Sequence, residues 1–303
     1  MIEIDWAEEA GRLRASAEGE ADWNRMVAAG VVRAGDKVAV DVGCGGGGMA
    51  KALSEALPAG ATVVAIDADP DVLEQAREHT GGAVRCELVS MDSGAEPLRK
   101  AIDAPADLIW ASASVHHAAD QQAAVDALAS LLAPGGRLAL AEGGLPARSL
   151  PWDLGVGEPG LELRLDAAQD RWFKVMRDSL PGSVPLPYGW TEALTRAGLV
   201  EVTTQSILSE TPAPLSPERL EQVVHGFRAR VDRLNPEVTD LIVGHGQGHG
   251  HGHSVPLDAE GLSAEDLATW ELLLDPEGEH YLGRRSDLAV LSVRSIHLGH
   301  AAR

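Results

Sequence analysis

A run of glycines follows an apolar segment near the start of the chain. The stretch "KVAVDVGCGGGGMAKAL" covers residues 37–53 and has glycine at 43 and at 45–48. Glycine lacks a Cβ and reaches backbone conformations with positive φ, so the main chain can approach a ligand closely. A helix that begins directly after such a turn adds N–H donors and a favourable dipole. The pattern predicts a site for nucleotide phosphates, a dinucleotide or S-adenosylmethionine.

The residues around these glycines separate the three ligands. A phosphate-binding loop needs Lys followed by Ser or Thr after the last glycine, but Met49 and Ala50 follow Gly48 here. The G-x-G-x-x-G spacing of residues 43–48, with Asp67 at the end of the next apolar run, fits a dinucleotide site. Asp41 opposes that interpretation, because a carboxylate repels a pyrophosphate and attracts an ammonium or sulfonium. The residues favour S-adenosylmethionine over a nicotinamide dinucleotide.

The elements that must position these residues alternate along the first half of the chain. Helical segments, among them 47–60, 70–82 and 121–136, separate short β-rich runs at 37–43, 62–69, 83–92, 106–115 and 137–144. Such alternation is typical of parallel βαβ units. We therefore expect an α/β fold, a Rossmann-like doubly wound and mostly parallel seven-stranded sheet with a helical cap insertion.

The later chain is less regular. Helical spacing appears over 161–180, 190–199 and 215–236, and residues 287–300 resemble a closing strand. We expect four segments: an N-terminal helical cap over 1–34, a cofactor-binding core over 35–144, a lid or substrate insertion over 145–190, and the rest of the core over 191–303. The last segment would contain a helical insertion and a His/Gly-rich loop at 244–254.

Composition limits the partners and the compartment. The formal net charge is −21, and so acidic a surface argues against a nucleic acid as substrate. Two cysteines fit a reducing compartment. The first residues lack the basic and apolar regions of a signal peptide, and no apolar run approaches the ~20 residues of a membrane span. We expect a cytoplasmic protein with no membrane partner.

Five short motifs occur in a fixed order between residues 37 and 144: "VDVGCGGGG", "VVAIDAD", "SMD", "ADLIWASASVHH" and "LAPGGRLALAE". The series resembles the motifs of class I S-adenosylmethionine-dependent methyltransferases that act on small molecules. The resemblance implies S-adenosyl-L-methionine as cofactor and a set of residues that bind it: Asp41, Gly43 and Gly45 at its methionine end, Asp67 at the ribose with Ala68 beside it, Met91 and Asp92 at the adenine, and Ala111 and Ser112 at its middle.

Two of these carboxylates have a simpler interpretation. Asp41 could cap the turn that follows it, and Asp67 could cap the helix that Pro70 opens.

Methyl transfer from a sulfonium is an in-line displacement in which the cofactor supplies the difficult chemistry. A hydroxyl or acidic C–H acceptor also needs a general base. His116 and His117 lie at the end of the fourth predicted strand, where such a base should stand, and histidine can act as a base near neutral pH. Glu142, at the end of the fifth strand, is a lesser candidate. Alternatively, one histidine only packs at the junction of strand and helix.

The acceptor predicted by elimination is a small molecule, methylated at oxygen or at an activated carbon. The fourth strand lacks the Asn-Pro-Pro-Tyr type of tetrad used on nucleobases. Aromatic residues gather in the expected lid, where they would suit a flat or apolar substrate or would only pack the lid: Trp152, Trp172, Phe173 and Tyr188.

The stretch "HGQGHGHGH" covers residues 245–253. His249, His251 and His253 alternate along an extended chain and could chelate zinc, nickel or copper. We favour a low-complexity loop that holds no metal. The alternatives to a methyltransferase are a nicotinamide-dependent oxidoreductase and a non-catalytic methyltransferase-like protein that binds a partner or handles metal.

Overall fold

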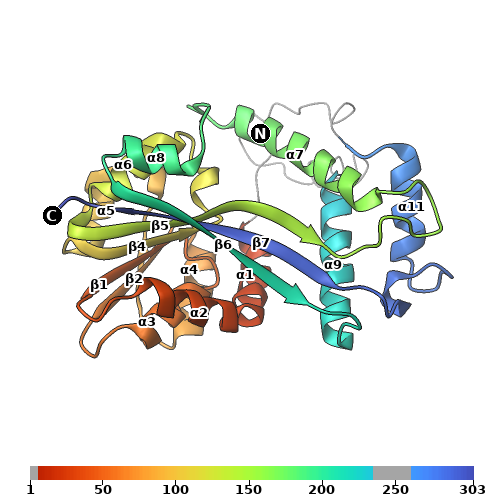
Figure 1. The fold of residues 1–303 in the computed structure, drawn as a ribbon, viewed down its shortest axis with the longest axis horizontal. Coiled ribbons are helices and arrows are strands. Elements are labelled where there is room, and N and C mark those ends of the chain that lie inside the picture. The colour runs from red at the N-terminus through yellow and green to blue at the C-terminus, as the bar shows by residue number, and fades with distance from the viewer. Residues whose placement is uncertain (1–5, 235–260) are drawn as a thin grey trace. The chain divides into compact units, whose positions relative to one another are not determined.

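The computed structural model of the protein describes residues 6–234 and 261–303 (Figure 1). The chain forms two compact units. The α/β unit contains the described residues up to Gly143, together with Pro181–Ile207 and Arg294–Arg303. The helical unit contains Gly144–Leu180 and the described part of Leu208–Val293.

A seven-stranded sheet is the centre of the α/β unit, with the strand order β3-β2-β1-β4-β5-β7-β6. The pairs β1–β2, β1–β4, β2–β3 and β4–β5 are parallel. The predicted Rossmann-like, mostly parallel sheet is therefore confirmed. The strand bounds are β1 (Val38–Val42), β2 (Thr62–Asp67), β3 (Arg85–Leu88), β4 (Ala106–Ser112), β5 (Leu132–Arg148), β6 (Val200–Thr211) and β7 (Val290–His300).

Strand β7 lies between β5 and β6 and runs against both (Figure 1). The Ala301 N–H donates to the Gly136 carbonyl, and the Gly135 N–H donates to the Ala302 carbonyl. The residue numbers rise on one strand while they fall on the other, which is the antiparallel pattern.

Helices cover both faces of this sheet. On β4, Leu108 and Trp110 belong to one apolar cluster, whereas Ile109 and Ala111 belong to another. Because neighbouring strand residues point to opposite faces, both faces are buried, as in a doubly wound fold. The helices of the α/β unit are α1 (Trp6–Gly19), α2 (Ala21–Val31), α3 (Gly48–Ala56), α4 (Pro70–Thr80), α5 (Ala95–Ile102), α6 (Gln121–Ala129) and α8 (Trp190–Arg196).

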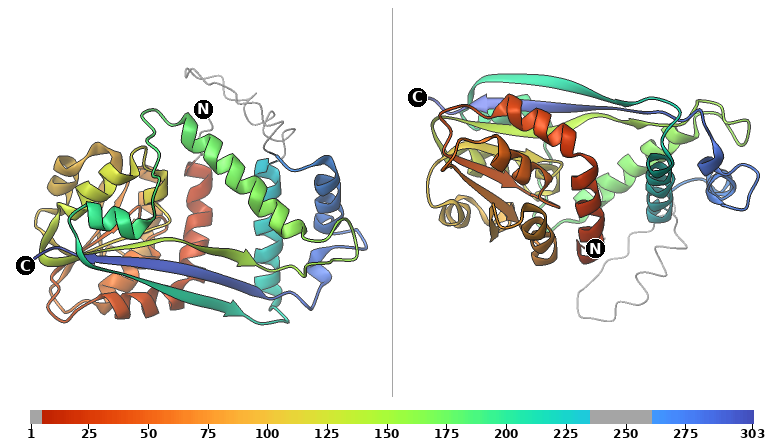
Figure 2. Two further views of the ribbon diagram at one scale, coloured as in Figure 1. Left: turned by 45° about the horizontal axis from the view of Figure 1, so that its top comes forward. Right: turned by 90° about the horizontal axis from the view of Figure 1, so that it is seen from below.

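The helical unit has a core of its own. It contains α7 (Leu161–Ser179), α9 (Pro217–Leu234) and α11 (Ala264–Leu274), coloured green, cyan and blue in Figure 2. Phe227 and Trp270 pack with their ring centroids 5.0 Å apart. The boundary between Gly143 and Gly144 lies within one residue of the expected start of the lid at 145, but the helical unit also contains α9, which comes from the later segment and shares this core with α7. The four-segment division stays a prediction.

One predicted helix is wrong over its second half. The helix expected over 121–136 ends at Ala129, and residues from Leu132 onward belong to β5. The Ala106 N–H donates to the Leu131 carbonyl, and Ala106 pairs with Leu132. Pairing with β4 therefore draws this segment into the sheet. Within the described ranges, no helix is long and apolar enough to span a bilayer.

Candidate functional site

The glycine turn after β1 is crowded by other parts of the protein. A Cβ on Gly46 would lie 2.4 Å from the Leu13 carbonyl oxygen of α1, and one on Gly47 would lie 2.9 Å from Ala76 Cα of α4. A Cβ on Gly43 would lie 2.4 Å from the Ser114 Cβ. At these three glycines, other residues of the protein fill the space that a Cβ would need, so their lack of a side chain serves internal packing.

Gly45 is different, because a Cβ there would meet only the Leu13 side chain, at 3.8 Å. Its φ of +51° is a conformation that glycine adopts at little cost. Its N–H donates to Asp67 Oδ2 over 3.2 Å. The turn therefore presents its backbone at Gly45 and orients the carboxylate at the end of β2.

Asp41 holds a buried carboxylate beside this turn. Its exposed fraction is 2%, and its Oδ2 has no hydrogen-bond partner among the described residues. Burial raises the pKa of Asp41 to about 7; the Ala50 N–H of α3 opposes this shift and the charge on Asp67 adds to it. The bond from Ala50 agrees with the capping interpretation of Asp41, but it leaves one oxygen unsatisfied. An unpaired buried oxygen of this kind fits a cationic ligand.

Asp67 does not cap the next helix. Asp69 does so, because its Oδ1 accepts the N–H groups of Asp71 and Val72 at the start of α4. The Asp67 carboxylate accepts from Gly45, Ala68 and Asp69. Burial raises the pKa of Asp67, and these three backbone bonds oppose the shift. Burial of the Asp67 carboxylate is unfavourable for its charged form. Such a position is consistent with a carboxylate that binds a ligand.

Of the other residues implied for the cofactor, Ala111 and Ser112 end β4, whereas Met91 and Asp92 lie in a short 3-10 turn after β3. Ala111 pairs with Val42 of β1, and Ser112 pairs with Ala141 of β5. Met91 packs against the apolar cluster that contains Ala111. Asp92 accepts the Ala119 N–H over 3.0 Å, so its carboxylate is tied to the loop that follows β4.

The His116 ring contacts the Glu142 carboxylate, and the two would form an ion pair if the ring were protonated. The His116 Nδ1 lies 2.8 Å from Glu142 Oε2, while Glu142 Oε1 accepts the N–H groups of Ser114 and Val115. Glu142 is 3% exposed. The carboxylate is thus held on both oxygens, and the two residues named separately from the sequence are brought together. His117 packs on His116 with the ring centroids 4.2 Å apart.

The loop that holds His116 begins with a strained residue. Ala113 has a φ of +47°, which residues with a Cβ rarely adopt. Its N–H donates to Ala141 on β5. The Ser114 hydroxyl donates to the Val42 carbonyl, and the Gln121 amide donates to the His116 carbonyl. Strain held by such bonds is typical of functional loops.

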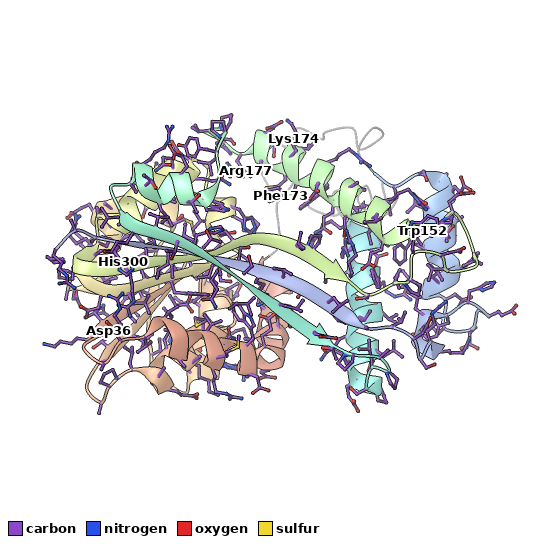
Figure 3. All side chains as sticks on the ribbon, viewed as in Figure 1. Asp36, Trp152, Phe173, Lys174, Arg177 and His300 are labelled. Carbon is purple, nitrogen blue, oxygen red and sulfur yellow. The ribbon has the colours of Figure 1, made fainter. Side chains whose placement is uncertain are left out.

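The aromatic residues expected to contact substrate lie in different environments. Trp152 is 69% exposed (Figure 3). Trp172 belongs to the core of the helical unit, where Phe173 packs against the same cluster. Tyr188 belongs to the α/β unit; its hydroxyl donates to Gln122 Oε1, and the Arg196 guanidinium lies 4.2 Å from its ring centre. The packing interpretation accounts for Trp172, and substrate contact by the four residues stays a prediction.

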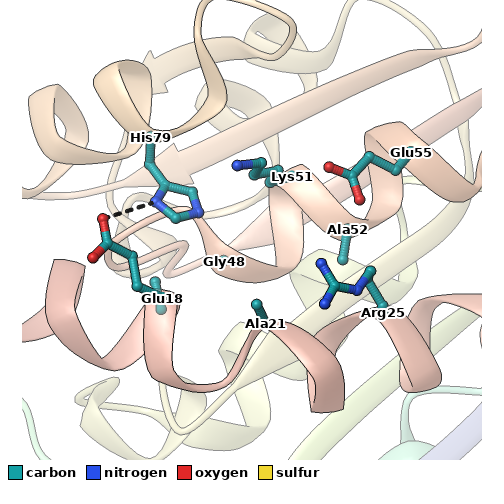
Figure 4. Close-up of a pocket in the computed structure, with 9 residues that line it drawn as sticks. Glu18, Ala21, Arg25, Gly48, Lys51, Ala52, Glu55 and His79 are labelled. Atoms are coloured by element: carbon teal, nitrogen blue, oxygen red, sulfur yellow. Dashed lines mark ion pairs between the residues drawn. The ribbon is translucent and has the colours of Figure 1, made fainter.

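A cavity of about 170 Å³ is bordered by α1, α2, α3 and α4, with Gly48 in its lining (Figure 4). Its lining carries both signs of charge. Glu18 and Glu55 are acidic, whereas Arg25, Lys51 and His79 are basic, and Glu18 lies 4.0 Å from the His79 ring. Because the two carboxylates offset the basic groups, the lining selects for no single charge type.

Metal binding finds no support in the described ranges. They contain no group of three or more His, Cys, Asp or Glu side chains placed to hold an ion. The histidine run 245–253 lies outside the described residues, so the predicted loop without metal and the alternative of metal chelation are both untested.

Two polar residues of the site were not foreseen. His297 Nε2 lies 3.1 Å from the Glu142 carbonyl oxygen, and His297 Nδ1 lies 2.8 Å from Thr204 Oγ1. The available signal was a histidine at 297 inside the strand pattern "VLSVRSIHLGH", which ends in a second histidine, His300. His297 reaches Glu142 only because β7 pairs with β5, although the two residues are 155 positions apart in the sequence.

Known proteins match the first half of the chain. Residues 40–138 match the family described as Methyltransferase domain. A ubiquinone biosynthesis O-methyltransferase of Xylella fastidiosa is 40% identical over 99 residues, which are 33% of this chain and 39% of that protein. The namesake from Thiobacillus denitrificans is 40% identical over 106 residues, which are 34% of this chain and 42% of that protein.

The chain thus spans about two fifths of the length of these curated relatives. Among solved structures, a phosphoethanolamine N-methyltransferase of Haemonchus contortus is 11% identical with a TM-score of 0.47, over 93% of this chain and 53% of that one. The family match, the glycine turn and the strand order agree with one another. Residues 40–138 therefore belong to the methyltransferase domain family, as a class I domain of the S-adenosylmethionine-dependent type.

Proposed function

We propose that this protein transfers the methyl group of S-adenosylmethionine to a hydroxyl oxygen of a small-molecule acceptor. The observation that carries the choice of an acceptor that must lose a proton is the pair formed by His116 and Glu142, and the O-methyltransferase names of the relatives favour oxygen. An acceptor that must lose a proton needs a base of this kind, whereas one that is already ionised does not. Methylation at an acidic C–H is the second candidate, since it needs the same base.

The residues around the glycine turn fit the methyl donor. Asp41 offers an unsatisfied buried oxygen to a cation, and Gly45 leaves its backbone accessible. Asp67 offers a carboxylate at the end of β2 for the ribose hydroxyls. When bound, the sulfonium supplies an electrophilic methyl group. We assign the remaining contacts to residues at the same sheet edge: Gly43, Ala68, Met91, Asp92, Ala111 and Ser112.

His116 would act as the general base. Glu142 accepts two backbone N–H groups on one oxygen, so its other oxygen is directed at His116 Nδ1. A carboxylate accepts hydrogen bonds, so the neutral imidazole carries its proton on Nδ1 and its lone pair on Nε2. The carboxylate then stabilises the imidazolium that forms when the ring takes a proton from the acceptor.

The class of acceptor rests on charge and on the relatives. The net charge of −21 disfavours nucleic acid. The relatives named above are called ubiquinone biosynthesis O-methyltransferases, so a hydroxylated aromatic ring is the first acceptor class to test. We further infer a cytoplasmic location, with neither nucleic acid nor membrane as partner. Two free cysteines support that location.

Cofactor binding is tested without turnover. Calorimetric titration should show micromolar binding of S-adenosylmethionine and S-adenosylhomocysteine to the wild-type protein and none of NAD. Asp67→Ala should lose both ligands. Binding of NAD alone would overturn the proposal in favour of an oxidoreductase.

The base is tested by Glu142→Gln in an acceptor screen that measures S-adenosylhomocysteine release and the added methyl mass. The amide oxygen can still accept from Ser114 and Val115, but its NH₂ then faces His116 Nδ1 and moves the ring proton to Nε2. We expect kcat to fall by about 10²–10⁴ while cofactor affinity persists.

A matched control is Glu162→Gln in the helical unit. Glu162 is also buried and also accepts backbone N–H groups, from Ser149 and Leu150, but none of the hydrogen bonds described for it comes from a histidine. Its variant should keep kcat. Equal rates in wild-type protein and Glu142→Gln would rule out the pair as the base.

A further inference from the structure

The Glu142 main chain is fixed by a histidine from a distant part of the sequence. His297 on β7 lies beside Glu142 on β5, and its Nε2 is 3.1 Å from the Glu142 carbonyl oxygen. A carbonyl oxygen only accepts, so Nε2 is the donor. In the neutral ring Nδ1 then carries the lone pair, and the Thr204 hydroxyl of β6 donates to it over 2.8 Å. The Glu142 carbonyl thereby sets the tautomer of His297, and the Thr204 hydroxyl holds the other ring nitrogen.

The backbone at Glu142 needs such support because the chain bends directly after it. Gly143 has a φ of +71° and Gly144 a φ of +109°, outside the range of an extended strand. The side chain of Glu142 meanwhile holds the loop after β4 through Ser114 and Val115. A small rotation of the Glu142 backbone would therefore move the carboxylate relative to His116.

We infer that His297, oriented by Thr204, is a positioning residue that acts through Glu142 on His116. The chain of contacts crosses three neighbouring strands, from Thr204 on β6 to His297 on β7 and Glu142 on β5, and reaches the loop after β4. All these residues belong to the α/β unit. The inference rests on the proposed function only for its effect on rate; the effect on the His116 ring is independent of turnover.

The variants separate positioning from general stability. His297→Leu removes both ring nitrogens, whereas His297→Gln keeps an N–H donor on a side chain of similar reach. Ser295→Ala is the matched control, because the Ser295 hydroxyl bonds to the Ser206 hydroxyl across the same two strands, at 3.1 Å, and no hydrogen bond from it to Glu142 is found among the described residues.

The first readout is the ¹⁵N NMR spectrum of the full chain labelled at histidine, with the His116 signals identified by their loss in His116→Gln. The wild-type ring should show the Nδ1–H tautomer. His297→Leu should shift part of the population to Nε2–H, whereas His297→Gln and Ser295→Ala should keep the wild-type spectrum. Urea unfolding of each variant checks that the fold persists.

The second readout is steady-state kinetics with an acceptor found in the screen. His297→Leu should lower kcat about tenfold with the KM for S-adenosylmethionine unchanged, and His297→Gln should restore most of the rate. An unchanged tautomer in His297→Leu, or the same shift in Ser295→Ala, would overturn the inference. A shifted tautomer with an unchanged kcat would leave the contact chain in place and instead contradict the proposed base.

Discussion

The buried carboxylate at the glycine turn makes the stability of the ligand-free protein depend on pH. Burial raises the pKa of Asp41 from its ordinary 3.8 to about 7. Between these values the folded protein keeps a proton that the unfolded chain has lost, so the free energy of unfolding falls as the pH rises. Integration of the linkage relation from pH 5 to pH 8 gives a loss of about 2–3 kcal/mol from this one group.

Asp41→Asn removes the titration. Its carbonyl can still accept the Ala50 N–H, and its unpaired amide hydrogens add a cost of about 1–3 kcal/mol that is the same at every pH. The stability of the variant relative to wild type should therefore rise by about 2–3 kcal/mol between pH 5 and pH 8. Urea unfolding without cofactor at the two pH values measures this difference.

The control is Asp71→Asn, which replaces an exposed carboxylate on α4. Its stability relative to wild type should change by less than about 0.5 kcal/mol between the same pH values. A parallel pH dependence in wild type and Asp41→Asn would show that Asp41 loses its proton in the folded protein as easily as in the unfolded chain. The burial argument would then be refuted.

Three further predictions concern the same unit. Affinity for the cationic cofactor should increase from pH 6 to pH 8, because a cation favours the ionised Asp41, and calorimetry should find the increase absent in Asp41→Asn. Gly46→Ala places a Cβ 2.4 Å from the Leu13 carbonyl oxygen; it should lower the free energy of unfolding by about 1–3 kcal/mol. Gly35→Ala, which meets nothing within 4 Å, should leave that free energy nearly unchanged. Arg294→Gln removes the ion pair that ties β7 to the junction of α1 and α2, so hydrogen exchange should accelerate in those two helices but not in α6.

The alternation of apolar runs and helices was enough to predict the sheet, because buried parallel strands are short and continuously apolar. The strand expected over 106–115 is observed as Ala106–Ser112, and the helix expected over 161–180 as Leu161–Ser179. Local patterns failed where a distant strand decides the structure, as at Leu132, which pairs with Ala106 instead of continuing a helix.

In the site, too, local patterns predicted the positions of residues but not the contacts that distant strands create. Residue types and positions predicted that His116 and Glu142 would lie near the strand ends, but not that they would contact each other. The contact depends on the positive φ at Ala113, which no local pattern specifies. His297 was missed because its role arises only from the pairing of β7 with β5. Gly46 and Gly47 had no predicted role of their own; their missing Cβ atoms leave room for α1 and α4.

The strand order has a consequence for the order of assembly during synthesis. The ribosome makes β5 and β6 before β7, yet β7 lies between them. Until residues 290–300 emerge, the two earlier strands cannot reach their final places and each has an unsatisfied edge, which favours association with other chains. The core of the helical unit also forms late, because α7 can pack into it only after α9 has been synthesised. The nascent chain should therefore depend on holding chaperones late in translation, after the glycine turn has already formed.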